Sequence, residues 1–293
     1  MRRPLAPLFV VAAPLLLGLG TASCTRSLKL DRFTTEESSI QTISPINVNY
    51  FDVKFTAKSM LPHFNEYLEV RIVDRLNHVQ AKAIYDEIVY ADFTIHLARV
   101  IPKANAPYRL DFWADHNLSG RYDGIVGGVN DKDHAWRRVL AAPLPEDMRL
   151  VGSRYELEFL HDTSFVDIFT DLDGNPISGE DTLLPCDVGV TAKAYVGKMV
   201  ELRVVEKASG RLVGLYRQGR ARETFHALIP GILDEQTQYD VSVYVDANDS
   251  GSYDEGDPSW KLEFTSKETG AAIDADLAVL PQSPIDTGEQ GAE

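Results

Sequence analysis

The sequence predicts an all-β protein whose body consists of two tandem antiparallel β-sandwiches. The chain matches itself at offsets of 131 to 135 residues, which fits two copies of one domain better than a short solenoid repeat. Short segments in both copies alternate between apolar and polar residues, as half-buried strands do. Turn-forming residues separate these segments, and no helical periodicity lasts longer than a turn or two. These observations together predict a fold of short strands.

Three pairs of segments carry the internal repeat. Residues 56–58 of the first copy match 191–193 of the second, 68–74 match 200–206, and 108–115 match 239–246. Seven strands are expected in each copy. Those of the first copy lie near 46–57, 67–74, 78–86, 93–100, 107–114, 135–141 and 155–161. Those of the second copy lie near 187–195, 199–207, 211–219, 223–229, 238–246, 259–266 and 272–280.

The segments outside the two copies are polar or signal-like and set the expected domain boundaries. The expected parts are a signal peptide over 1–23, a tether over 24–44, a first sandwich over 45–162, a linker over 163–186, a second sandwich over 187–281 and a disordered tail over 282–293. Hydrophobic residues make up 44% of the chain and charged residues 25%. This composition excludes a disordered chain and a multispanning membrane protein.

Tyr108 and Tyr239 each open a strand shortly after a proline-containing connection. This placement resembles the tyrosine corner of immunoglobulin-like and fibronectin type III domains. The resemblance covers both copies and implies immunoglobulin-like sandwiches. Sandwiches of another topology, including transthyretin-like ones, stay open.

The N-terminus has the layout of a secretory signal. Arg2 and Arg3 precede an uncharged apolar stretch over 4–20, and small residues then lead to Cys24. The stretch is too short and too interrupted by proline for a membrane span. Its ending resembles the lipobox of bacterial lipoproteins, which implies that Cys24 carries lipid, including palmitate, and anchors the chain at the outer membrane of the cell envelope, facing the periplasm or the surface. Ordinary cleavage after Ala22 is the alternative.

The net charge and the cysteine count narrow the possible partners. The formal charge is −15, and loss of Arg2 and Arg3 with the signal would make it −17. Nucleic acid is therefore excluded as a partner, and cations are favoured. If Cys24 carries lipid, Cys186 has no partner for a disulfide and is expected to be a small buried or linker residue.

Residues 246–257 resemble the twelve-residue calcium loop of EF-hand and dockerin-type sites. Calcium prefers hard oxygen ligands, and such loops place them at alternate positions, with glycine sixth. The resemblance implies six ligands: Asp246, Asn248, Ser250, Ser252 through its carbonyl, Asp254 and Asp257. The twelfth position holds aspartate where the family has a bidentate glutamate, so a dissociation constant of about 10⁻⁴ M or weaker is expected. A metal-free polar turn is the alternative.

The first copy contains an incomplete version of this loop. Its candidate ligands are Asp115, Asn117, Ser119, Arg121 and Asp123. Val126 stands at the twelfth position, so the site is incomplete unless a residue from the longer loop that follows supplies the missing ligand. The candidates for that replacement are Asn130, Asp131 and Asp133.

Two further groups of residues give alternative functions. Six of the seven histidines fall in the first copy, at positions 63, 78, 96, 116, 134 and 161, and Met60 with His63 and either His116 or His134 could bind copper or zinc. No histidine pair has a recognised ligand spacing, so scattered histidines are the simpler interpretation. Trp113, Trp136, Trp260, Tyr122 and Tyr253 could stack on sugar rings, although a structural role is favoured.

The leading expectation is a noncatalytic, lipid-anchored envelope protein. Its calcium-stiffened loops would bind a protein or polysaccharide partner outside the cytoplasm. No phosphate-binding, metalloprotease, nucleophile-elbow or thiol-redox motif is present in the sequence. The alternatives are a periplasmic transition-metal-handling or enzymatic protein that uses the histidines of the first domain, and a carbohydrate-binding module.

Overall fold

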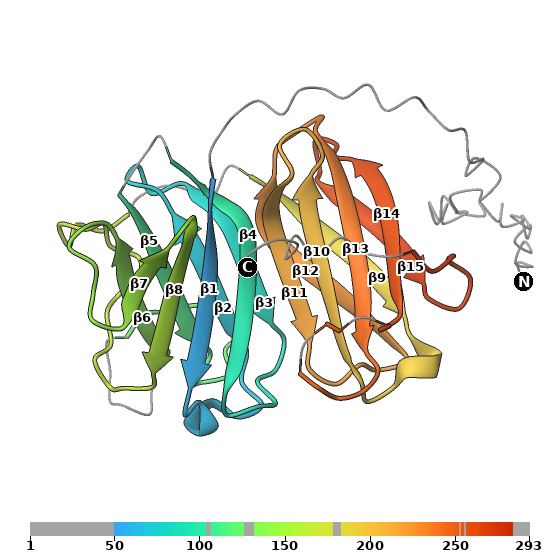
Figure 1. The fold of residues 1–293 in the computed structure, drawn as a ribbon, viewed down its shortest axis with the longest axis horizontal. Coiled ribbons are helices and arrows are strands. Elements are labelled where there is room, and N and C mark those ends of the chain that lie inside the picture. Colours follow the sequence, from blue (N-terminus) through green and yellow to red (C-terminus); the bar gives the residue numbers. More distant parts are fainter. Residues whose placement is uncertain are drawn as a thin grey trace, which may run out of the picture. The chain divides into compact units, whose positions relative to one another are not determined.

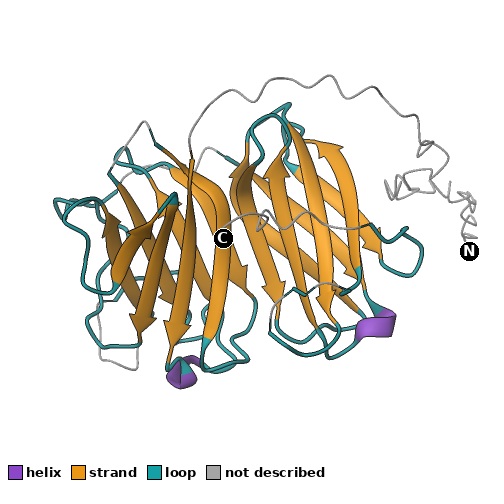
Figure 2. Cartoon of the chain, viewed as in Figure 1, coloured by secondary structure: helices purple, strands orange, loops and turns teal. Residues whose placement is uncertain are grey.

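The computed structural model describes residues 50–103, 107–125, 132–177, 183–251, 253–254 and 256–283. The described residues belong to one compact unit. Their strands are joined by loops and by the 3₁₀ turns η2 and η3 (Figure 2). The expected signal peptide, the tether with Cys24, and position Ser252 of the second loop lie outside the described residues. Within the described ranges, no helix combines the length and the apolar character that a membrane span requires.

The first repeat packs two four-stranded layers against each other. Its elements are β1 (Tyr50–Lys58), η2 (Leu61–His63), β2 (Leu68–Val73), β3 (Val79–Tyr85), β4 (Phe93–Pro102), β5 (Tyr108–Ala114), β6 (His134–Leu140), β7 (Met148–Val151) and β8 (Arg154–Leu160). One layer has the order β4-β1-β8-β7, and the other has the order β3-β2-β5-β6. Phe55, Phe112 and Trp136 fill the core between these layers.

The second repeat has the same arrangement without a counterpart of β7. Its elements are β9 (Leu184–Thr191), η3 (Lys193–Tyr195), β10 (Met199–Glu206), β11 (Arg211–Gln218), β12 (Thr224–Leu233), β13 (Gln238–Asp246), β14 (Ser259–Thr265) and β15 (Ala271–Asp276). The layers are β12-β9-β15 and β11-β10-β13-β14. Their core contains Trp260 and Tyr239.

The structure confirms the all-β sandwich class. The seven strands expected in each repeat are present near the expected positions, and β7 is an additional strand. The sheets are mixed, since β8 pairs in parallel with β1 and β15 in parallel with β9. The order within each sandwich, which the sequence left open, differs from the constant immunoglobulin order, where the first, second, fifth and fourth strands share one sheet. Tyr239 does form the expected corner, because its hydroxyl accepts a hydrogen bond from the Asp234 N–H at 2.8 Å.

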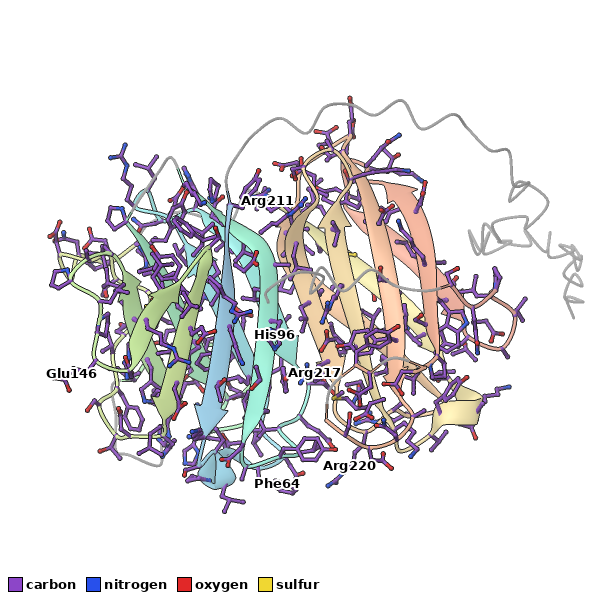
Figure 3. All side chains as sticks on the ribbon, in the orientation of Figure 1. Phe64, His96, Glu146, Arg211, Arg217 and Arg220 are labelled. Carbon is purple, nitrogen blue, oxygen red and sulfur yellow. The ribbon has the colours of Figure 1, made fainter. Side chains whose placement is uncertain are left out.

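One sheet runs through both repeats (Figure 1). Strand β11 pairs in parallel with β3, which produces an eight-stranded sheet of order β14-β13-β10-β11-β3-β2-β5-β6. Side chains strengthen this junction: the Arg217 guanidinium, labelled in Figure 3, lies over the Tyr85 ring at 4.6 Å. Lys82 Nζ also donates to the Pro230 carbonyl at 2.7 Å. The two repeats therefore form one continuous structure, which the sequence did not predict.

Candidate functional site

The two acidic loops leave the shared sheet at the same end. The first loop follows β5 and the second follows β13. Both strands run in the direction of β3 and β11, because β5 is antiparallel to β2 and β2 to β3, and the same relations hold for β13, β10 and β11. The parallel β3–β11 pair then gives all four strands one direction. This end of the sheet is the lower one in Figure 1.

The second loop is folded around the buried carboxylate of Asp246. Its Oδ1 accepts a hydrogen bond from the Ser250 N–H at 3.0 Å, and its Oδ2 accepts one from the Gly251 N–H at 2.7 Å. Asn248 Oδ1 accepts from the same Ser250 N–H at 2.9 Å, and Asn248 Nδ2 donates to Asp254 at 3.1 Å. Gly251 has a φ of 83°, where a side chain would be strained. The loop therefore brings Asp246, Asn248 and Asp254 together, as expected.

The first loop repeats this hydrogen-bond pattern. Asp115 accepts from the Ser119 N–H at 2.9 Å and from the Gly120 N–H at 2.8 Å. Asn117 accepts from the Ser119 N–H at 3.1 Å and donates to Asp123 at 3.1 Å. The predicted ligands Asp115, Asn117 and Asp123 are thus clustered. The Arg121 carbonyl accepts a hydrogen bond from the Ser119 hydroxyl at 2.7 Å.

Asp133 closes the first loop in the way that Asp257 closes the second. Asp257 Oδ2 accepts from the Asp254 N–H at 2.9 Å, and Asp133 Oδ2 accepts from the Asp123 N–H at 2.8 Å. The two aspartates are therefore structural counterparts. Asp133 was one of three candidates to replace the missing twelfth ligand, and the other two, Asn130 and Asp131, lie outside the described residues.

The carboxylate of Asp133 lies in an electrostatically unfavourable environment. The residue is only 1% exposed, and its Oδ1 has no hydrogen-bond partner among the residues that the structure describes. Burial, together with the nearby Asp123 and Asp115 carboxylates, raises the pKa of Asp133 to about 6, although the hydrogen bond from the Asp123 N–H lowers it. A buried anion without full hydrogen bonding is costly unless a positive charge compensates it. The first loop thus has a buried oxygen available for a cation.

The structure also brings four histidines together, which the sequence spacing did not indicate. His63 Nε2 lies 3.1 Å from His161 Nε2 and 3.3 Å from His134 Nδ1. His63, His116 and His134 offer ring nitrogens that all lie within 4.8 Å of one another. These side chains come from η2, the loop after β5, the start of β6 and the residue after β8. We call these four residues the histidine cluster.

Glu66 connects two members of the histidine cluster. Its Oε2 lies 2.6 Å from His63 Nδ1, and its Oε1 lies 2.9 Å from His116 Nδ1. Burial lowers the pKa of His161, and neighbouring His63 lowers it further. Met60, which was grouped with His63 in the sequence, belongs to the hydrophobic core.

The tryptophans and the cysteine have structural roles. Trp113, Trp136 and Trp260 are all buried, so they form no exposed platform for sugar rings. Cys186 is buried as expected, and burial raises the pKa of its thiol to about 12. A thiol with so high a pKa is a poor nucleophile at neutral pH.

Comparisons with known proteins identify no family for the chain. No family model matches it, and no curated protein matches it. Among solved structures, a crystal structure from Parabacteroides distasonis, named a "putative cell adhesion protein", is 11% identical and covers 83% of this chain and 93% of its own, with a TM-score of 0.20. A TM-score this low supports no inference about the fold or the function of this chain.

Proposed function

We propose that the chain is a noncatalytic, lipid-anchored protein of the cell envelope whose two acidic loops bind calcium and present a contact surface to a protein or polysaccharide. The observation that carries this proposal is the unpartnered, buried Oδ1 of Asp133 beside Asp115 and Asp123. Calcium prefers such carboxylate oxygens, and the binding of a divalent ion relieves repulsion among them. The matching hydrogen-bond pattern of the second loop supports a second site there.

Calcium is expected to stabilise the protein and to bind at two sites per chain. With a dissociation constant of about 10⁻⁴ M, calcium at about 10 mM raises the free energy of unfolding of the protein by about 2.7 kcal/mol for each occupied site. Isothermal titration of the full chain measures the stoichiometry, and calorimetric melting with and without calcium measures the stabilisation. An unchanged melting temperature in millimolar calcium would contradict the proposal.

Variants assign the two sites. Asp133→Asn keeps the shape of the side chain and removes its charge, so it should reduce the stoichiometry from two to one, and addition of Asp257→Asn should reduce it to zero. The control is Asp171→Asn, because Asp171 accepts backbone hydrogen bonds from Asp173 and Asn175 in a turn outside both loops. Equal calcium binding by the Asp133→Asn variant and the control would refute the first site.

The lipid anchor requires Cys24. The wild-type chain is expected in the membrane fraction and in the detergent phase after phase separation, because lipid chains drive membrane binding. Cys24→Ser should shift it to the soluble fraction, whereas Cys186→Ser should leave it in the membrane fraction, since Cys186 is buried in the second repeat. Retention of the Cys24→Ser variant in the detergent phase would exclude this anchor.

The loop end of the sheet is the proposed contact surface for the partner. Leu118, in the first loop, is 72% exposed, which leaves an apolar side chain available for contact. Ordering a flexible loop costs conformational entropy, and a bound ion reduces that cost before the partner arrives. The immobilised wild-type chain should retain an envelope protein or polysaccharide in the presence of calcium and release it when a chelator is added. The Asp133→Asn/Asp257→Asn variant should not retain it.

A further inference from the structure

We infer that His63, His116, His134 and His161 form a binding site for a divalent first-row transition-metal ion, which adjoins the first acidic loop but uses imidazole nitrogens instead of its carboxylates. A tetrahedral site with metal–nitrogen distances of about 2.0–2.1 Å holds its ligand nitrogens about 3.3–3.4 Å apart. His63 Nε2 lies 3.1 Å from His161 Nε2 and 3.3 Å from His134 Nδ1. These two separations are close to those of a tetrahedral site, and ring nitrogens of His63, His116 and His134 all lie within 4.8 Å of one another.

Glu66 offers a carboxylate oxygen to each of two imidazoles of the histidine cluster. It lies within hydrogen-bonding distance of Nδ1 of both His63 and His116. A neutral imidazole that donates its Nδ1–H to a carboxylate keeps the lone pair on Nε2. Metal-bound histidines usually donate the second ring N–H in this way, which fixes the ring orientation and increases the basicity of the ligand nitrogen. Glu66 therefore acts as a positioning residue for the proposed site.

For a neutral His63 with its proton on Nδ1, hydrogen bonds within the cluster do not account for both short nitrogen–nitrogen distances. With Nδ1–H donated to Glu66, His63 Nε2 has one lone pair in the ring plane, yet two other ring nitrogens lie within 3.3 Å of it. One lone pair accepts one strong hydrogen bond. A metal ion bound to the three nitrogens would accept a lone pair from each of them.

The second repeat shows that the fold does not need these histidines. The N–H of His63 donates to the Met60 carbonyl, and the N–H of Tyr195 donates likewise to the Ala192 carbonyl. The His63 ring lies 5.6 Å from Trp136, as the Tyr195 ring does from Trp260. Tyr195 is therefore the counterpart of His63, and it closes the sandwich end with an ordinary aromatic side chain.

The other three histidines also have counterparts that bind no metal. Ala247 and Pro258 follow Asp246 and Asp257 as His116 and His134 follow Asp115 and Asp133. The N–H of Leu277 donates to the Thr191 carbonyl as that of His161 donates to Lys58. Four positions that are aromatic or apolar in one repeat are histidine in the other, and the four histidines converge. A common ligand explains this difference, whereas packing alone does not.

Imidazole ligands narrow the class of metal. Nitrogen ligands suit zinc, copper, nickel and iron, whereas calcium and magnesium prefer oxygen. His63 is fully buried and His134 nearly so, while the side chain of His116 is 22% exposed, so the cluster is reachable from one side. Zinc is the probe of choice because it has no redox chemistry, and cobalt reports the coordination geometry through its absorption spectrum.

The test is titration of the full chain, stripped of metal with a chelator, with zinc in about 10 mM calcium to keep the carboxylate loops occupied. One zinc per chain is expected, and cobalt should give the intense visible absorption of a tetrahedral nitrogen site. His161→Ala and His116→Ala, at partly exposed positions, should weaken zinc binding at least tenfold, and Glu66→Gln should weaken it about 10–100-fold. Because these variants avoid the buried His63, their folding can be verified by circular dichroism.

Two exposed histidines beside carboxylates serve as matched controls. The His226 side chain is 74% exposed, and its Nδ1 lies 3.1 Å from Asp187 Oδ1. The His78 side chain is 68% exposed, and its Nδ1 lies 3.4 Å from Asp74 Oδ2. His226→Ala and His78→Ala should leave zinc binding unchanged. Absence of stoichiometric zinc binding by the folded wild-type chain, or equal affinity of the His161→Ala and His226→Ala variants, would overturn the proposal. If the His161→Ala variant loses zinc binding but keeps calcium binding, the zinc site is independent of the proposed calcium function.

Discussion

Glu201→Gln is expected to lower the free energy of unfolding by about 3–5 kcal/mol, as does the loss of one partner from a buried ion pair. Glu201 is fully buried, and its carboxylate pairs with Arg217 and with Arg203, whose Nε lies 2.8 Å from Oε1. A neutral glutamine leaves both guanidinium groups in the sheet without an anion. Urea denaturation of the wild-type and variant chains measures the difference.

Glu263→Gln is the matched control for this prediction. Glu263 pairs with Lys207 at 2.6 Å, but its side chain is 57% exposed, so the substitution should cost less than about 1 kcal/mol. Similar losses of unfolding free energy in the two variants would show that burial does not make the Glu201 ion pairs more important for stability than an exposed pair.

The same carboxylate is expected to contribute to acid sensitivity. Burial alone would raise the pKa of Glu201, but Arg217 and Arg203 outweigh burial and lower it to about 2. Because the folded pKa lies below the unfolded value of about 4.3, the stabilisation is complete above about pH 4.3 and is lost as the pH falls towards 2. The Glu201→Gln variant should lose less stability over this interval than the wild type does.

Trp136→Ala is expected to cost about 3–5 kcal/mol, the usual loss for a large aromatic side chain removed from a core. Trp136 is fully buried, with ring centroids of Phe112, Phe159 and Phe165 at 5.4, 5.2 and 5.5 Å. Its Nε1 also donates to the Asp162 carbonyl at 3.2 Å. Denaturant unfolding followed by far-ultraviolet circular dichroism measures the loss.

A pair of Trp→Phe variants separates packing from hydrogen bonding. Trp260 occupies the equivalent place in the second repeat, but its Nε1 is buried without a partner among the described residues. Trp136→Phe should therefore cost about 1 kcal/mol more than Trp260→Phe. The reverse order would contradict a stabilising role for the Trp136–Asp162 bond.

The sequence predicted the strands well because their apolar and polar residues alternate, and strands such as β1, β9 and β12 bury alternate residues. It missed β7 because only Met148 of its four residues is buried, so no alternation exists to detect. It also missed the junction between the repeats. The parallel pairing of β3 with β11 joins two sheet edges, and edge pairing depends on backbone geometry that side-chain patterns do not encode.

The candidate sites were predicted unequally, for reasons of chain spacing. The ligands of the second loop follow one another closely, so their pattern is visible in the sequence. In the first loop, Asp133 follows Asp123 by ten residues, whereas Asp257 follows Asp254 by three, and this insertion obscures the equivalence. The histidine cluster comes from four separated segments whose spacing has no regularity, and only the folded sandwich brings them together.

The continuous sheet has a consequence for how the protein resists aggregation and unfolds. A separate sandwich would present β3 or β11 as an open edge, with unpaired backbone donors and acceptors that can recruit a strand from another molecule. Each repeat covers the vulnerable edge of the other. The pairing of β3 with β11 thus leaves neither strand as an open edge, and it links the two halves so that neither opens without exposing the backbone of its neighbour.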